Sequence, residues 1–370
     1  PLFFLPWTGD VLNFNKQALL IFLVFISFFA WMLKILISGR FKFTFSWIHI
    51  PLLVLTLVLF FSTLFSLYSY GSFWGWPQAA SESFLTSLCF VLFYFLTINI
   101  FEKEEIFYLI IYLLFSVFLA MFFGMFQLFG KFIFPFAFSK TSSFNTIGST
   151  GSLAVLTAVL LPLLILLIIK VKKKLLRVFF TASAVLGTLL LVLINFSIAW
   201  WLVIIGSVLT ITLIAQKRDI LDNRWLILPM FFLAISLLFI FLKPQVPGVP
   251  NRPVEVFLNQ QASSDIAWKS LKKNPVLGSG PGTFIFDFSK YKNASFNKSR
   301  LWNIKFGKAG SEFFNDLTTT GILGALSFLS LIGLFIFYGI KILFIEQRKK
   351  KKQSSSKNKE IVANPVKNSA

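Results

Sequence analysis

The chain has 370 residues, of which 56% are hydrophobic and only 13% are charged, and its mean hydropathy is +0.80. Soluble domains carry about 25% charged residues, so this composition excludes an ordinary soluble protein and indicates a multi-pass membrane protein. One His and one Cys are too few for a metal site built from such ligands, and phosphate-loop and dinucleotide motifs are absent from the sequence. We therefore expect no metal and no cofactor. Because the chain begins at Pro1 without an initiator Met, we also expect an additional N-terminal segment.

Nine apolar runs are long enough, or nearly so, for a helix that crosses a bilayer, which needs about 20 residues. In chain order they cover residues 18–37, 48–67, 83–101, 106–126, 151–169, 175–194, 198–215, 225–242 and 321–345. The sixth and seventh runs are separated only by residues 195–197, which suffice for a tight polar hairpin. The sequence thus predicts an all-α polytopic fold with about nine transmembrane helices.

The distribution of Lys and Arg in the short loops predicts the orientation, because cytoplasmic loops are enriched in these residues. If the basic C-terminal tail is cytoplasmic, four short loops share its side, and the three short loops opposite hold only Lys131 and Lys140. The four loops contain eleven basic residues: Arg40, Lys42, Lys103, Lys170, Lys172, Lys173, Lys174, Arg177, Lys217, Arg218 and Arg224. We therefore predict a protein of the cytoplasmic (inner) membrane with a cytoplasmic C-terminus.

This orientation divides the chain into four parts. Residues 1–242 hold the first eight helices, residues 243–311 form a long extracytoplasmic loop with short helices, residues 312–345 hold the last helix, and residues 346–370 form a basic, disordered tail that contacts membrane lipids. The loop has a marked excess of Lys and Arg over acids. This excess is either a plain solvated surface in a protein rich in Lys, or a binding surface for an anion such as a lipid diphosphate.

The loop contains three patterns. Residues 259–273 predict an amphipathic helix that ends at Asn274-Pro275, with Trp268 as an anchor at the membrane interface. After this helix, every second residue is glycine at three positions, Gly278, Gly280 and Gly282. These glycines form either a structural turn or a backbone nest that binds an anion. Residues 284–306 alternate aromatic and basic side chains, a pattern that suits nucleic acids or sugars. An extracytoplasmic location favours glycans and argues against nucleic acid.

Three stretches resemble the O-antigen ligase and polymerase superfamily of integral-membrane glycosyltransferases. They are residues 268–284, residues 312–324 and, more weakly, residues 147–162. The resemblance implies that glycan is transferred or polymerised from a polyprenyl-diphosphate donor to a lipid, protein or growing-chain acceptor, outside the cytoplasm. This chemistry requires an activated acceptor hydroxyl and a stabilised leaving diphosphate.

The chain departs from the family pattern at three places. Gly310-Ser311 stands where the family usually has His-Asn, Ile198 replaces an Arg that commonly follows a Ser, and Ser149-Thr150 replaces Asn-Pro. Two alternatives to an active transferase therefore remain: a catalytically inactive glycan-binding or assembly subunit, and a transporter of lipid-linked glycan.

The candidate site residues follow from the loop and its resemblance. Glu312 is the candidate catalytic residue that would orient or deprotonate the acceptor hydroxyl, since it lies beside the position of the missing His; Asp287 and Asp265 are weaker alternatives. Asn315 and Asp316, one turn further along, are expected to line a cavity. The remaining substrate-binding candidates are Arg252, Lys273, Arg300 and Lys305 for the diphosphate, Trp268 and Trp302, and the glycines Gly278, Gly280 and Gly282.

Overall fold

The computed structural model describes residues 1–39, 43–76, 79–216, 222–242, 244 and 256–363, and these residues form an all-α structure without a β-strand. The long helices are α1 (Asn13–Ser38), α2 (His49–Leu64), α4 (Phe84–Ile100), α5 (Lys103–Leu128), α6 (Thr150–Lys170), α7 (Lys174–Ile194), α8 (Ser197–Gln216), α9 (Ile227–Leu242), α10 (Gln260–Lys273) and α13 (Gly321–Ala363). The short elements are α3 (Ser69–Trp74), α11 (Phe284–Tyr291), α12 (Glu312–Thr319) and the 3₁₀ turns η1 (Ala80–Glu82), η2 (Ala137–Ser139), η3 (Asn223–Leu226) and η4 (Ala294–Lys298).

Each of the nine predicted apolar runs forms a helix. Seven of the helices in the described ranges are long and apolar enough to cross a membrane: α1, α5, α6, α7, α8, η3 with α9, and the first half of α13. The other two, α2 with 16 residues and α4 with 17, are apolar but shorter. The prediction of a multi-pass all-α membrane protein is therefore confirmed.

Local sequence signals explain where several helices begin and end. Asn195 ends α7 in a left-handed conformation with φ of 50°, so α7 and α8 are separate helices, as the short polar break predicts. The side chain of Ser149 accepts a hydrogen bond from the Ser152 backbone at the start of α6. At the start of α5, Glu102 and Glu105 form a reciprocal capping box.

The C-terminal end of the chain differs from the prediction of disorder after residue 346. The backbone of α13 remains helical to Ala363, while residues 364–370 lie outside the described residues. Once an apolar segment has nucleated a helix, each further residue adds one backbone hydrogen bond, and Lys, Gln and Glu are good helix formers. The polar tail therefore extends the last helix over residues 346–363.

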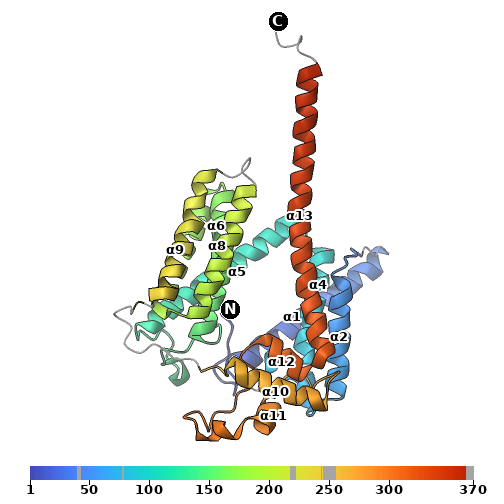
Figure 1. Cartoon of the computed structure of the whole chain (residues 1–370), viewed down its shortest axis with the longest axis vertical. Helices are drawn as coiled ribbons and strands as arrows, with labels where there is room; N and C mark the ends of the chain where they lie inside the picture. Colours follow the sequence, from blue (N-terminus) through green and yellow to red (C-terminus); the bar gives the residue numbers. More distant parts are fainter. Residues whose placement is uncertain (40–42, 77–78, 217–221, 243, 245–255, 364–370) are drawn as a thin grey trace. The chain divides into compact units, whose positions relative to one another are not determined.

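The chain consists of two compact units. Unit 1 comprises Pro1–Lys34 and Leu96–Val256, and unit 2 comprises Ile35–Phe95 and Phe257–Ala370. In unit 1, α6 packs against α7, α8 and α9, as Figure 1 shows for α6, α8 and α9. Glycines allow the close approach: a Cβ on Gly206 of α8 would lie 2.1 Å from the Cγ atom of Pro162 in α6, and one on Gly187 of α7 would lie 2.9 Å from Thr157.

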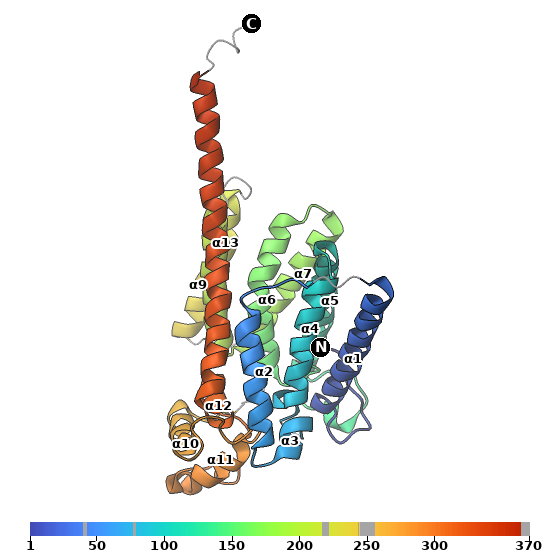
Figure 2. The same ribbon diagram turned by 90° about the vertical axis from the view of Figure 1, so that its right-hand side faces the viewer.

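Unit 2 combines membrane helices with the folded loop. Helix α13 packs along α2, and α10 and α12 gather at its N-terminal end beside α11 (Figures 1 and 2). The loop has a small aromatic core of its own, in which Phe284, Phe288 and Phe306 are buried together with Ile266 of α10. The aromatic residues of the alternating segment thus turn inward in part, instead of all facing a ligand, because burying aromatic surface stabilises the folded loop.

Candidate functional site

The glycine turn after α10 packs against the junction of α12 and α13. Gly278, Gly280 and Gly282 all have positive φ, of 66°, 114° and 71°. The backbone N–H of Gly280 donates to the Thr319 carbonyl at 2.8 Å, and a Cβ on Gly278 would lie 2.5 Å from that same carbonyl group. Glycine is therefore required for close approach to α12. Because the Gly280 N–H is already bonded to Thr319, it is not free to join the anion nest that the sequence suggests.

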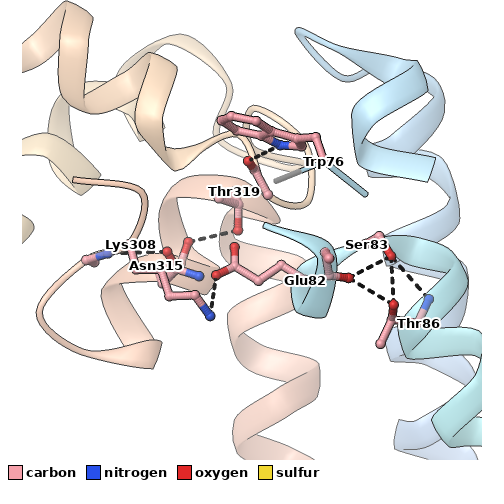
Figure 3. A network of polar contacts seen from close by, with 10 residues as sticks. Trp76, Glu82, Ser83, Thr86, Lys308, Asn315 and Thr319 are labelled. Atoms are coloured by element: carbon pink, nitrogen blue, oxygen red, sulfur yellow. Dashed lines mark hydrogen bonds and ion pairs between the residues drawn. The ribbon is translucent and has the colours of Figure 1, made fainter. Parts of the chain in front are cut away.

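Side chains from the α2–α3 region fix this turn from the other side. Ser62 Oγ lies within hydrogen-bond distance of the carbonyl oxygens of Leu277 (2.7 Å) and Thr319 (3.1 Å), so one hydroxyl joins the turn to the end of α12. The indole Nε1 of Trp76 donates to the Gly282 carbonyl at 3.1 Å, as Figure 3 shows. These bonds between distant segments hold α12 in a defined position within unit 2.

Helix α12 presents four polar residues on one face. It begins at the N-cap Ser311 and ends before Gly321, whose φ is 68°. The spacing of Glu312, Asn315, Asp316 and Thr319 places them on the same side of a helix. All four line a cleft of about 190 Å³. We call this the carboxylate cleft; its further lining residues are Leu55, Leu59, Ser81, Glu82, Ser87, Pro281, Gly282, Thr320 and Phe328.

Glu82 brings a third carboxylate to the carboxylate cleft. It ends η1, which is fixed because the hydroxyls of Ser83 and Thr86 both donate to the Ala80 carbonyl, at 3.1 and 2.9 Å. Figure 3 shows the Glu82 side chain directed toward the Lys308 ammonium, with which it forms an ion pair of 2.7 Å. The Glu82 side chain is only 10% exposed and that of Lys308 46%, so this pair is shielded from water mainly on the carboxylate side.

Burial and mutual repulsion shift the pKa values of the acids. Burial raises the pKa of Glu312, and the nearby Lys308 opposes this shift only in part. The pKa of Asp316 is raised to about 7, first by burial and then by the charges of Glu312 and Glu82. For Lys308, burial alone would lower the pKa, but attraction to Glu82 outweighs it and the pKa is raised. The proton on Asp316 is therefore held more tightly than on an ordinary aspartate, while Lys308 stays charged at neutral pH.

Asn315 supports the segment that precedes α12. It is buried, and its Oδ1 accepts a hydrogen bond from the Ala309 backbone at 3.4 Å. Gly310 follows Ala309 in the chain and stands where the family resemblance would place His. Its N–H donates to Ser263 Oγ at 2.8 Å, and a Cβ on it would lie 2.1 Å from the Leu258 carbonyl oxygen. A larger residue cannot fit here without a shift of the backbone, so Gly310 has a packing role against α10.

The predicted cationic residues do not line the carboxylate cleft. Lys273, Arg300 and Lys305 are exposed elsewhere on the folded loop, and Arg252 lies outside the described residues. The side chain of Lys290 lowers the pKa of Lys273, mainly through a side-chain hydrogen bond and to a smaller extent through repulsion between the two positive charges. This cationic pair is therefore a separate feature of the loop surface.

The two predicted tryptophans also lie away from the carboxylate cleft. Trp268 and Trp302 are exposed to 65% and 63%. The predicted helix around Trp268 is confirmed: Asn259 caps α10, the helix ends before Asn274, and Ile266, Ala267, Ser270 and Leu271 are buried on its inner face. Trp268 projects from the opposite face, and its role as an anchor at the membrane interface stays a prediction.

The alternative acids occupy different surroundings. Asp265 is exposed on α10, whereas Asp287 is buried under the glycine turn, where its Oδ1 accepts from Ser270 Oγ at 3.2 Å. Burial raises the pKa of Asp287 against the opposing effect of hydrogen bonds from Ser279 and Ser270. Neither residue lines the carboxylate cleft. In the described part of the chain, no group of three or more His, Cys, Asp and Glu residues is arranged to hold a metal ion.

Sequence reasoning missed Glu82 and Lys308. Glu82 is the single acid between Asp10 and Glu102, and an isolated carboxylate directly before an apolar helix was a usable signal. Lys308 gave no such signal, because the loop is rich in Lys. Only the folded chain shows which lysine meets the acids.

Comparisons of the chain with models of known protein families, with curated proteins and with solved structures found no match.

Proposed function

We propose that the carboxylate cleft is the active site of a membrane glycosyltransferase that transfers or polymerises glycan from a polyprenyl-diphosphate donor. The observation that carries this proposal is a cleft lined by three carboxyl groups, Asp316, Glu312 and Glu82, in which burial raises the pKa of Asp316 to about 7, as suits a general base at neutral pH. These residues share the cleft with Asn315, next to apolar residues of α2 and α13. The family resemblance of residues 268–284 and 312–324 supports the same reaction class.

In this mechanism the acceptor hydroxyl gives its proton to Asp316 as its oxygen forms a bond to the anomeric carbon of the donor. The bond from that carbon to the diphosphate breaks, and its electron pair leaves with the diphosphate. Burial, together with the charges of Glu312 and Glu82, keeps the pKa of Asp316 high enough for it to accept the proton. Lys308 balances part of the negative charge, and the basic loop surface with Lys273, Arg300 and Lys305 attracts the anionic donor.

The membrane arrangement is part of the proposal. We propose that α2 and α4 also cross the membrane, which gives nine spans, and that the loop of residues 243–311 faces the outside of a cytoplasmic membrane. The count of Lys and Arg in the short loops supports this orientation. The polyprenyl chain then lies among apolar helix surfaces while its diphosphate reaches the loop.

The transferase proposal is tested by an activity assay on the purified full-length chain in detergent or nanodiscs. The donor is undecaprenyl-diphosphate oligosaccharide, the acceptors are lipid A–core, a second donor molecule and an acceptor peptide, and products are detected by mass spectrometry. Elongated or transferred glycan is the expected result. If the chain binds the donor but forms no product with any of these acceptors, the transferase proposal is rejected.

The inactive glycan-binding subunit remains the second candidate. The observation that favours it is that Lys273, Arg300 and Lys305 do not line the carboxylate cleft, which leaves the leaving diphosphate without these cations at the reacting bond. Donor binding without product would support this candidate. A transporter would instead move labelled donor across the membrane of proteoliposomes.

The orientation is tested by cysteine labelling. Ser289 and Asn223 are exposed, and the native Cys89 is buried and can be replaced by Ser. A membrane-impermeant maleimide added to whole spheroplasts should label Ser289→Cys and leave Asn223→Cys unlabelled until the cells are lysed. The reverse pattern would reject both the orientation and the extracytoplasmic reaction.

A further inference from the structure

A second cleft lies within the folded loop, between α10, the end of α11 and η4. Its volume is about 330 Å³, which falls in the range of small-molecule sites. One wall is formed by Gln261, Asp265 and Lys269 of α10, and the other by Tyr291, Lys292 and Phe296. We call it the α10–α11 cleft. It shares no lining residue with the carboxylate cleft.

The α10 wall offers polar groups at regular helical spacing. Gln261, Asp265 and Lys269 are four residues apart, so successive turns of the helix place an amide, a carboxylate and an ammonium group side by side. Lys269 Nζ donates to the Tyr291 carbonyl at 3.1 Å and thereby joins the two walls. The side chains of Gln261 and Asp265 make no hydrogen bond within the described ranges of the chain. Both are free to bind a ligand.

The opposite wall is aromatic and positively charged. Phe288 and Phe296 pack edge to face with ring centroids 5.3 Å apart. The Lys292 ammonium lies 5.8 Å from the centroid of Phe288 and 5.7 Å from that of Phe296. Among the residues that the structure describes, neither Lys269 nor Lys292 has an acidic partner. Phe288 is only 1% exposed, so the ring surface that this wall offers is that of the half-buried Tyr291 and Phe296, beside the Lys292 ammonium.

These features select the chemical class of a ligand. A purely apolar ligand would bury Asp265 and Lys292 without partners, which is costly. A small inorganic anion would use the lysines but would leave the rings and the hydrogen-bonding side chain of Gln261 unused. A sugar ring carries adjacent hydroxyls that both donate and accept, which suits the amide and carboxylate of Gln261 and Asp265, while its C–H faces pack on aromatic rings. A carboxylate on the sugar would pair with Lys292.

We propose that the α10–α11 cleft is a binding site for an acidic sugar residue of a glycan. The site is distinct from the carboxylate cleft and does not depend on the catalytic role of Asp316. If the transferase proposal holds, the α10–α11 cleft binds part of the glycan away from the bond that reacts. It then gives the protein a preference for glycans that contain uronic acid.

The proposal is tested by titration of the full-length chain in nanodiscs with methyl β-D-glucuronide, methyl β-D-glucoside and inorganic phosphate, followed by saturation-transfer NMR. We expect saturable, salt-sensitive binding of the glucuronide that is tighter than that of the glucoside. Gln261→Ala combined with Asp265→Asn should weaken glucuronide binding about tenfold, because hydrogen bonds to the sugar hydroxyls are lost. Lys292→Gln should abolish the advantage of the glucuronide over the glucoside.

Ser264→Ala is the matched control, since Ser264 lies on α10 between the two polar residues, bonds only to the Gln261 backbone carbonyl and does not line the α10–α11 cleft. It should bind the glucuronide like the unmodified chain. Absence of saturable glucuronide binding, equal binding by the double variant and the control, or displacement by phosphate at equal affinity would overturn the proposal. Asp316→Asn separates the two proposals, because it should lower the transfer rate at least about 100-fold and leave glucuronide binding unchanged.

Discussion

The two units differ in how they satisfy their buried polar groups. In unit 1, buried hydroxyls return to their own helix: Thr157 donates to the Leu153 carbonyl and Ser236 to that of Phe232, each four residues earlier. In unit 2, some hydroxyls do the same, as Thr318 does with Phe314, but others join segments that are far apart in the sequence, as Ser62 does with Leu277 and Thr319. Unit 1 is thus specified by apolar packing and close helix contacts, whereas unit 2 depends on a network that positions charged groups. The following predictions test this difference.

The largest expected effect is on transfer activity in unit 2. Asp316→Asn removes the proposed general base, so the rate of glycan transfer should fall by about 10²- to 10⁴-fold while the protein still folds and binds donor. The control is Asp222→Asn, an exposed aspartate of unit 1, which should transfer like the unmodified chain. Transfer by Asp316→Asn within threefold of normal would remove Asp316 from the mechanism.

In unit 1 the largest expected effect is on stability instead of activity. Trp200 is 1% exposed, and its ring stacks on Phe239 with centroids 4.6 Å apart. Trp200→Ala should lower the free energy of unfolding by about 3–5 kcal/mol, measured by thermal unfolding in a constant detergent. The neighbouring Trp201 is 55% exposed. Trp201→Ala is the matched control and should lower the free energy of unfolding much less. The pH dependence of transfer by the folded fraction should stay unchanged in both variants.

The glycine turn gives the next effect. Gly278→Ala forces an L-residue into positive φ and places a Cβ 2.5 Å from the Thr319 backbone. It should destabilise the protein by about 2–4 kcal/mol and reduce transfer as well, because α12 must move. Gly333→Ala in α13, where a Cβ would meet nothing within 4 Å, should be neutral or slightly stabilising. Equal melting temperatures for the two variants would contradict the close packing of the turn.

The smallest predicted effect concerns pH. Lys308 lowers the pKa of Glu312 and Asp316, so Lys308→Gln should raise both values further. Because Asp316 acts in its deprotonated form, the acidic limb of the transfer rate should move to higher pH, by up to about one unit. At neutral pH the variant should therefore be less active than the unmodified chain, and it should recover activity at higher pH. Lys172→Gln, at an exposed position in unit 1, is the control variant. Identical pH profiles of transfer for the two variants would show that Lys308 does not influence the pKa of the base.

Much of the fold could be predicted because membrane helices are encoded locally. Apolar runs identified seven long and two shorter apolar helices of the described residues, and the break at Asn195 and the end of α10 before Asn274 were readable from residue type. The prediction for the tail differed from the structure because composition describes an isolated segment, and residues 346–363 continue a helix that is already formed. Glu312, Asn315 and Asp316 could be placed on one cavity because they share one short helix.

The sequence alone determined the class of protein, the positions of its apolar helices and the polar face of α12, since hydropathy and helical periodicity act over neighbouring residues. Only the tertiary structure decided that Glu82, from a segment more than 200 residues earlier in the chain, joins Glu312 and Asp316, and that Lys308 is the lysine that pairs with it. The same packing gave the glycine turn its role against α12 and raised the pKa of Asp316. Burial and the approach of distant charges set these properties, and neither is encoded in any local stretch of sequence.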